Sequence, residues 1–205
     1  MKEEFSFSIE EINELIKKEP KFEIFIEKFG ALTRTVNENI FESIIEAVIS
    51  QQISGKVAQV IYNRLIEKVK IISPENLLLL NEEEYKIIGL GKQKSSYIIS
   101  ISNSFLNGEI KEDNLKLLDD KKVIEELIKL KGVGEWTAEM LLIFSLKRKN
   151  ILSAKDLGIR KGLMKLYEKS SIDEVTNSFI EECRQKFSPL NTLASFYLWE
   201  IASLK

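Results

Sequence analysis

The sequence predicts an all-α protein, and three observations support this. Apolar residues recur every three or four positions along nearly the whole chain, which is the helical period. No segment sustains the alternation of apolar and polar residues that indicates a half-buried strand. The 205 residues include only nine glycines and three prolines, and 44% are hydrophobic, which is typical of a well-packed globular chain. We therefore expect an all-α helical bundle.

In the N-terminal third, local signals mark the ends of each predicted helix. Ser8 and Glu11 form a capping box that opens the first helix, and Gly30 is a typical stop for the second. The apolar-faced segment 40–69 predicts two helices that are interrupted near residues 52–55.

The middle of the chain continues this pattern. Ser73-Pro74 is an N-cap followed by proline at the first helical position, and Asn81 begins a short helix that Gly89 ends. Another helix is predicted over residues 92–107.

The following segment predicts a tight helical hairpin. The polar residues 112–114 form a connection, and a helix then covers about residues 120–130. Lys131-Gly132-Val133-Gly134 forces a turn, and a second helix continues through Leu146.

Two further helices complete the prediction. Ser171 and Glu174 form a capping box that opens one of them, and Ser188-Pro189 starts the last, which carries Trp199.

Composition excludes several classes of protein. The chain has no histidine and one cysteine, Cys183, so it lacks the usual zinc ligands and cannot form a Ser-His-Asp triad. Catalysis must therefore rest on carboxylates, lysines or hydroxyls. The net charge of −2 does not indicate a nucleic-acid binder, so any basic surface must be local. Residues 131–165 carry eight basic and three acidic side chains, a local charge of +5.

No apolar run reaches the roughly 18–20 residues that are needed to cross a bilayer. The N-terminal residues 1–11 are acidic where a secretory signal would be basic. We therefore expect no membrane association and an intracellular location, in the cytoplasm or nucleoid, or in the nucleus if the source is eukaryotic.

The segment Leu130–Ala138 has the chemistry of a phosphate-binding turn. Gly132 and Gly134 can adopt conformations, or close approaches, that a Cβ atom would prevent. The helix that follows presents unpaired N–H groups and the positive end of its dipole, which suits a phosphate oxygen. The alternative to a phosphate-binding turn is an ordinary helical turn in which a glycine ends the helix.

The nine residues LKGVGEWTA resemble the hairpin of the helix-hairpin-helix DNA glycosylase superfamily, specifically the 3-methyladenine DNA glycosylase II group. Five other segments occur in the family's order and approximate spacing, and the resemblance covers residues 19–203. They are Glu19-Pro20, Ile49–Ser54, Gly89-Leu90-Gly91 with Lys94, Asp156–Ile159 and Ser195–Trp199.

The resemblance implies an architecture as well as an activity. We expect two helical lobes with a cleft between them: residues 36–117 form one, and residues 1–35 with 118–205 form the second. The second lobe carries the hairpin and the catalytic aspartate. We expect a monomer whose partner is double-stranded DNA that contains damaged bases.

Asp156 is the expected catalytic carboxylate, because it matches the family's essential aspartate near a helix start. Cleavage of an N-glycosidic bond builds positive charge on the sugar, which a fixed carboxylate stabilises while it orients the attacking water. The alternative role is a helix N-cap, a common use of aspartate.

Trp136 bears on the type of reaction. Members that also nick the strand carry a lysine at this hairpin position, where its amine forms a Schiff base with the sugar. The resemblance therefore implies a monofunctional glycosylase that leaves an abasic site. Lys131, Lys155 and Lys161 lie near enough in sequence to be alternative sources of such an amine.

The resemblance assigns the remaining contacts. Gln52 corresponds to the residue that fills the gap left by the flipped nucleotide. The base pocket is expected to be lined by Trp136, Met140, Leu157 and Leu190. The DNA backbone is expected to contact Leu130, Gly132, Val133, Gly134 and Thr137. For Gln52 the alternative is a polar residue at a helix break, and for the pocket residues it is ordinary core packing.

Met140, Leu157 and Leu190 stand where well-known members have aromatic rings, and Asn191 stands where an arginine is common. Phe187, Phe196 and Tyr197 are the other aromatic candidates for the pocket wall. The expected substrates are 3-methyladenine and 7-methylguanine, which are cationic and leave readily. The alternatives are a glycosylase for uracil, hypoxanthine or 8-oxoguanine, and a helix-hairpin-helix module that only binds DNA.

The resemblance implies no required cofactor. A structural Na⁺ or K⁺ ion is expected at the carbonyls of Leu130 and Val133. The family branch that carries an iron–sulfur cluster needs four cysteines, so no such cluster is expected here. Candidate phosphate contacts are Lys147, Arg148, Lys149, Arg160 and Lys161, each of which could equally be part of a solvated charged face.

Overall fold

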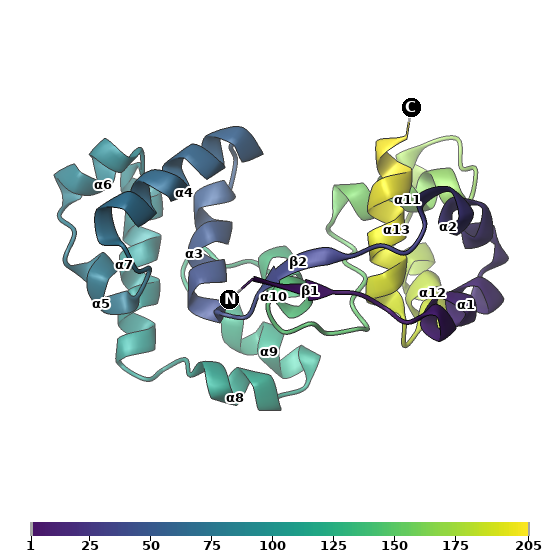
Figure 1. The fold of residues 1–205 in the computed structure, drawn as a ribbon, viewed down its shortest axis with the longest axis horizontal. Coiled ribbons are helices and arrows are strands. Elements are labelled where there is room, and N and C mark those ends of the chain that lie inside the picture. The colour runs from purple at the N-terminus through teal and green to yellow at the C-terminus, as the bar shows by residue number, and fades with distance from the viewer. Residues whose placement is uncertain (1, 205) are drawn as a thin grey trace. The chain divides into compact units, whose positions relative to one another are not determined.

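The computed structural model describes residues 2–204 and consists mainly of helices (Figure 1). The chain divides into two compact units. Unit 1 contains residues 37–146, and unit 2 combines residues 2–36 with the chain from Lys147 onward. The all-α prediction is confirmed, with the addition of one small two-stranded sheet.

Unit 1 is a contiguous bundle of eight helices within the described part of the chain. They are α3 (Ile40–Ser50), α4 (Gly55–Val69), α5 (Pro74–Leu78), α6 (Glu82–Ile88), α7 (Lys92–Leu106), α8 (Glu112–Leu117), α9 (Asp120–Leu127) and α10 (Glu135–Phe144).

The central helix of unit 1 is α3, which packs against α4, α7 and α10. Its side chains Ile44, Ile45, Val48 and Ile49 are inaccessible to solvent, which explains the apolar run in this segment. Serine or asparagine side chains cap α4, α5 and α6, as at Asn81, whose side chain accepts from the Glu84 N–H. Unit 1 is therefore a set of helices packed around one helix whose apolar face is buried.

Unit 2 brings together elements from both ends of the described chain. They are β1 (Lys2–Phe5), α1 (Ile9–Lys18), η1 (Pro20–Phe22), α2 (Glu23–Phe29), β2 (Arg34–Asn37, whose last residue is grouped with unit 1), α11 (Leu157–Leu166), η2 (Ile172–Glu174), α12 (Asn177–Phe187) and α13 (Asn191–Ser203).

The core of unit 2 is built on the contact between α11 and α13, which lie side by side in Figure 1. A Cβ atom on Gly162 would lie 2.3 Å from the Leu198 carbonyl oxygen, so only glycine allows this close backbone approach. Aromatic rings contribute to the same core: Phe22 meets Phe187 edge-on at 5.4 Å between centroids. The N-terminal helices are thus held by residues near the other end of the chain.

The sequence did not indicate the strands β1 and β2, which pair with each other. Each strand has only four residues, which is too short for alternating polarity to stand out. Residues 112–114, expected as a connection, instead form the first turn of α8.

The last two helices begin later than predicted. Ser171 and Glu174 do form a capping box, but it closes the single 3₁₀ turn η2. The α12 helix has a cap of its own at Thr176, and α13 begins at Asn191, after Ser188-Pro189. The predicted signals were therefore genuine local turns that stop short of a full helix.

The division into units differs from the lobes expected from the resemblance at one boundary. The hairpin residues 118–146 are grouped with unit 1, because α10 packs against α3 as well as α9. The expected functional lobes stay a prediction. Across residues 2–204, no helix is long and apolar enough to span a membrane.

Candidate active site

The hairpin between α9 and α10 turns over residues 128–134. Leu130 and Val133 anchor it, since both side chains are buried and the Val133 N–H donates to the Leu130 carbonyl at 3.0 Å. Thr137 is buried in the first turn of α10. Of the expected backbone-contact residues, these three therefore also hold the turn in place.

Gly132 is required by the geometry of this turn. Its φ of +87° lies in the left-handed region, and a Cβ atom would be 2.3 Å from Cδ2 of Tyr97 on α7. Its carbonyl accepts a hydrogen bond from Nε2 of Gln51 at 2.8 Å. The hairpin is thus packed against α7 and tied to the end of α3.

Gly134 is the N-cap residue of α10 and supplies no side-chain cap. No atom lies within 4 Å of the position that a Cβ would occupy, so the backbone here is open to an approaching group. Trp136, one position into the helix, is 42% exposed, and Met140 is partly exposed one turn later. Unit 1 therefore places an open helix start next to an accessible aromatic ring.

Gln52 lies in the turn between α3 and α4, which confirms the predicted helix break. It is exposed and has a φ of +58°, which is uncommon for a residue with a long side chain. The ammonium of Lys94 on α7 donates to the carbonyls of Ile49 at 2.5 Å and Gln51 at 2.7 Å. Gln51 thus connects the turn that carries Gln52 to the hairpin, while Lys94 connects it to α7.

Asp156 is the N-cap residue of α11 in unit 2, which confirms the capping role predicted as the alternative. Its Oδ1 accepts the Ile159 N–H at 2.8 Å, and only 8% of the residue is exposed. The chain that leads to it is fixed to α13, because Thr192 and Ser195 bond the backbone of Ile151. The carboxylate is therefore held in one orientation.

Trp199 on α13 is the second donor to this carboxylate. Its Nε1 lies 3.0 Å from Oδ1 of Asp156, and its ring stacks on Phe196 at 6.0 Å between centroids. A Cβ on Gly158 would lie 2.8 Å from Cδ1 of Trp199. Glycine at this position lets the indole reach the carboxylate. The sequence did not predict Trp199 as a residue of the site.

The two remaining residues that were expected in the base pocket, both in unit 2, differ in exposure. Leu157, next to Asp156, is 58% exposed, whereas Leu190 is 3% exposed and packs in the core. The rings of Phe187, Phe196 and Tyr197 are also fully buried. These three rings are core residues, and the aromatic group beside the carboxylate is Trp199.

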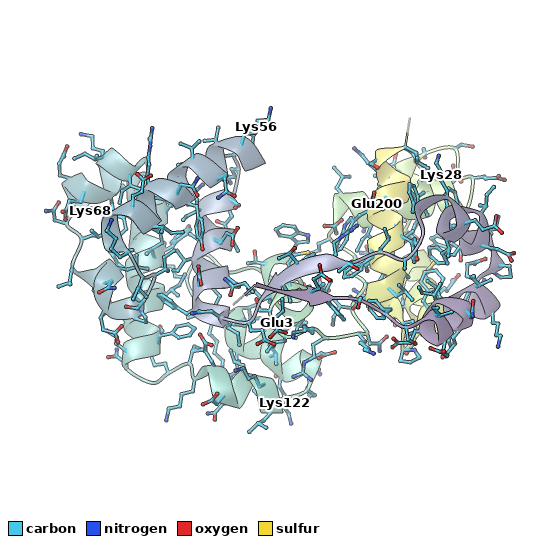
Figure 2. All side chains as sticks on the ribbon, viewed as in Figure 1. Glu3, Lys28, Lys56, Lys68, Lys122 and Glu200 are labelled. Carbon is cyan, nitrogen blue, oxygen red and sulfur yellow. The ribbon has the colours of Figure 1, made fainter. Side chains whose placement is uncertain are left out.

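Several candidate phosphate contacts are paired inside unit 2. Lys149 binds Glu11 at 2.6 Å, and Lys147 pairs with Glu3, which is labelled on β1 in Figure 2. The guanidinium of Arg160 donates to Ala154, Val175 and Asn177. Lys161, by contrast, is exposed. The local charge of +5 therefore overstates the cationic surface that is available to DNA.

Cys183 and the described acidic residues do not suggest a metal centre. Among residues 2–204, no three histidine, cysteine or acidic side chains are grouped so that they could hold a metal ion. Cys183 is buried in α12, and this burial raises the pKa of its thiol to about 11, so it is a poor nucleophile at neutral pH.

The family follows from a direct match. Residues 45–186 match the family described as HhH-GPD superfamily base excision DNA repair protein. The chain belongs to this superfamily. The matched range includes Gln52, the hairpin and Asp156.

Individual HhH-GPD relatives are similar along most of their length. The chain is 31% identical over 168 residues to DNA-3-methyladenine glycosylase 1 of Schizosaccharomyces pombe, which covers 80% of this chain and 73% of the relative. The crystal structure of a DNA-3-methyladenine glycosidase from Bacillus halodurans superposes with a TM-score of 0.86 at 29% identity, covering 98% of this chain and 93% of that one.

A third HhH-GPD similarity is to a protein–DNA complex. The structure of the 3-methyladenine DNA glycosylase of Schizosaccharomyces pombe with abasic DNA gives a TM-score of 0.84 at 28% identity. This match covers 95% of this chain and 97% of that one.

Sequence reasoning missed three residues that support the site: Gln51, Tyr97 and Trp199. Gln51 is next to the expected wedge residue, and Trp199 belongs to one of the segments that resemble the family. The sequence therefore contained a signal for both residues. No pattern indicated that Trp199 bonds Asp156, because 43 positions separate them.

Proposed function

We propose that this protein is a monofunctional DNA glycosylase of base excision repair. It flips alkylated purines such as 3-methyladenine and 7-methylguanine out of the duplex, hydrolyses their N-glycosidic bond and leaves an abasic site. The observation that carries the proposal is that similarity to DNA-3-methyladenine glycosylases runs through the segments that contain the hairpin and the fixed carboxylate of Asp156.

The chemistry follows from the arrangement around Asp156. The bond between the purine nitrogen and C1′ of the sugar breaks, and its electron pair leaves with the base, which becomes neutral if it was cationic. The carboxylate stabilises the positive charge on the sugar and orients a water molecule. Oxygen from this water bonds to C1′, and its proton passes to the carboxylate or to solvent. Two fixed donors on Oδ1 keep the carboxylate aligned for this role.

Other residues act on the DNA in this proposal. Gln52 fills the gap left by the flipped nucleotide, and the open start of α10 at Gly134 binds a phosphate. Trp136 and Met140 of unit 1 contact the extruded base, and the accessible ring of Trp136 favours a cationic one. Trp136 also stands where strand-nicking members carry a lysine, which supports hydrolysis without strand cleavage. Such an activity implies a location with the chromosome, in the nucleoid or nucleus.

The hairpin also has carbonyl oxygens that can coordinate a monovalent cation. The carbonyl of Leu130 accepts one hydrogen bond, from Val133, and a carbonyl oxygen has two lone pairs. We include Na⁺ or K⁺ held by the carbonyls of Leu130 and Val133, where the ion would add positive charge near a bound phosphate. Replacing K⁺ with tetramethylammonium at equal ionic strength should weaken DNA binding. Unchanged affinity would contradict this part of the proposal.

The test uses duplexes that carry one modified base each, incubated with the purified chain and then treated with hot alkali. We expect strand cleavage at 7-methylguanine and 3-methyladenine only after alkali. The Asp156→Asn variant should lose excision by about 100-fold or more, because it removes the charge. Asparagine is also a good N-cap, so the fold and the binding of an abasic-site duplex should be retained.

A matched control is Asp113→Asn, at a carboxylate that is 97% exposed on α8, which should leave excision unchanged. If the wild-type chain excised none of the bases, the hypothesis that it is an enzyme would be wrong, and a DNA-binding module would be favoured. Release of uracil, hypoxanthine or 8-oxoguanine in place of alkylated purines would favour the alternative specificity. Nicking without alkali would overturn the monofunctional mechanism.

A further inference from the structure

The turn that carries Gln52 is held in an unfavourable backbone conformation. A left-handed φ at a residue other than glycine or asparagine is strained, and it persists only when the surroundings enforce it. Gln52 is exposed, so packing of its own side chain is not what enforces it. The constraint must come from its neighbours.

Lys94 supplies one constraint. The last carbonyls of a helix have no partners within the helix and carry partial negative charge. The Lys94 ammonium bonds two carbonyls where α3 ends, those of Ile49 at 2.5 Å and Gln51 at 2.7 Å. A single cation thus fixes the backbone on the N-terminal side of Gln52.

Gln51 and Tyr97 supply the connection to the hairpin. The Gln51 side chain donates to the Gly132 carbonyl at 2.8 Å. Tyr97 lies three positions after Lys94 on α7, and hence on the same face of that helix. Its ring covers Gly132 so closely that a Cβ there would be 2.3 Å away, and Gln93 bonds its hydroxyl at 2.7 Å. The first turns of α7 therefore contact both the Gln52 turn and the hairpin.

We propose that Lys94 is a positioning residue that fixes the Gln52 turn relative to the hairpin. Gln52, as the wedge, and the phosphate-binding hairpin then contact DNA as one rigid element. The inference rests on the proposed function, which gives Gln52 the wedge role. It adds that loss of Lys94 impairs base flipping without touching the carboxylate, which lies in unit 2. If the Gln52 turn is displaced, the hairpin still binds DNA, but the damaged base is extruded poorly.

The test compares Lys94→Met, Lys94→Arg and Gln52→Ala in single-turnover excision of 7-methylguanine. We expect Lys94→Met to slow excision from duplex roughly 10- to 100-fold, as misplacement of a positioning group does. Excision from a single-stranded oligonucleotide, where no base pair must be opened, should change less than about twofold. Lys94→Arg keeps the cation and should restore most of the duplex rate.

The double variant asks whether Lys94 acts through Gln52. In a Gln52→Ala background, Lys94→Met should cost less than about twofold further, because the two residues act as one unit. Multiplicative losses would overturn the proposal, and so would equal losses on duplex and single strand. The control is Lys92→Met, at a lysine on the same helix whose side chain is 90% exposed, which should match the wild type.

Amide hydrogen exchange separates this inference from the proposed function. The backbone amides of residues 51–54 should exchange faster in Lys94→Met than in the wild type. Their exchange rates should be unchanged in Lys92→Met, and both results are expected whether or not the protein excises bases. If the wild-type chain excised nothing, the proposed function would fail, and exchange would still decide the positioning role. Unchanged exchange at residues 51–54 in Lys94→Met would overturn it.

Discussion

The indole Nε1 of Trp199 donates to Oδ1 of Asp156 across 3.0 Å, and Gly158 provides the space for this approach. The same oxygen accepts the Ile159 N–H. A residue that in sequence passes for a helix cap therefore has a second, aromatic donor from another helix. This second donor links the orientation of the carboxylate to α13.

Trp199→Phe tests this link, because phenylalanine keeps a ring and removes the donor. A hydrogen bond to a charged group contributes about 1.5–3 kcal/mol, so we expect single-turnover excision to fall roughly 10- to 100-fold with DNA affinity unchanged. Combined with Asp156→Asn, the substitution should add almost nothing. An unchanged excision rate together with a lower free energy of unfolding would show that Trp199 only supports folding.

Gly132→Ala and Gly134→Ala should have opposite profiles. Gly132→Ala meets both a left-handed φ and the Tyr97 ring, so the free energy of unfolding should fall by about 1–3 kcal/mol. Gly134→Ala has open space around the new methyl group and should leave stability unchanged while it weakens binding of an abasic-site duplex. Urea denaturation and fluorescence anisotropy measure the two effects. Unweakened binding in Gly134→Ala would argue against a phosphate close to this backbone.

Arg160 and Lys161 are neighbours that should differ in the salt dependence of DNA binding. Arg160 is bonded to three groups of unit 2, so Arg160→Met should lower stability and leave the salt slope as it is. Lys161 is exposed, and Lys161→Met should reduce the slope of log K against log salt by about one if it contacts a phosphate. Equal slopes for Lys161→Met and the wild type would remove Lys161 from the interface.

Glu19 should make stability depend on pH. Its burial would raise its pKa, but hydrogen bonds from Lys186, Tyr167 and the Lys21 N–H outweigh this and hold the pKa below its ordinary value. A carboxyl with a lowered folded-state pKa stabilises the protein above its unfolded pKa of about 4.3 and loses this as pH falls through the folded value.

Glu19→Gln should therefore lower the free energy of unfolding at pH 7 by about 1.5–3 kcal/mol. The gap to the wild type should shrink as the pH drops below about 4. Urea denaturation at pH 7, 5, 4 and 3 measures it. Glu14→Gln, at a half-exposed carboxylate on α1, is the control, and a gap that stayed constant with pH would contradict the assignment.

Local chemistry explains which parts of the fold could be predicted. Capping boxes at Ser8 and Asn81 and the glycine turn at Gly132 act over a few residues, so sequence reveals them. The pairing of β1 with β2 depends on residues about 30 positions apart, and nothing in either four-residue segment indicates it.

The site shows the same limit. The types and spacing of Asp156 and the hairpin residues could be recognised by resemblance, whereas the cationic residues could be counted but not assigned. Arg160 and Lys161 look alike in sequence, yet one is used inside the protein and the other is exposed. Which charges meet solvent is decided by tertiary packing, which composition does not contain.

Unit 2 is assembled from the two ends of the described chain, and this has a consequence for synthesis on the ribosome. Unit 1 is contiguous and can collapse as it emerges, whereas helices α1 and α2 must wait for α12 and α13, which supply Phe187 and the Tyr197 hydroxyl that bonds Gly30. The surroundings of Asp156 are therefore completed last. A nascent chain therefore forms the hairpin of unit 1 before the surroundings of Asp156, so an incomplete chain carries no assembled carboxylate site.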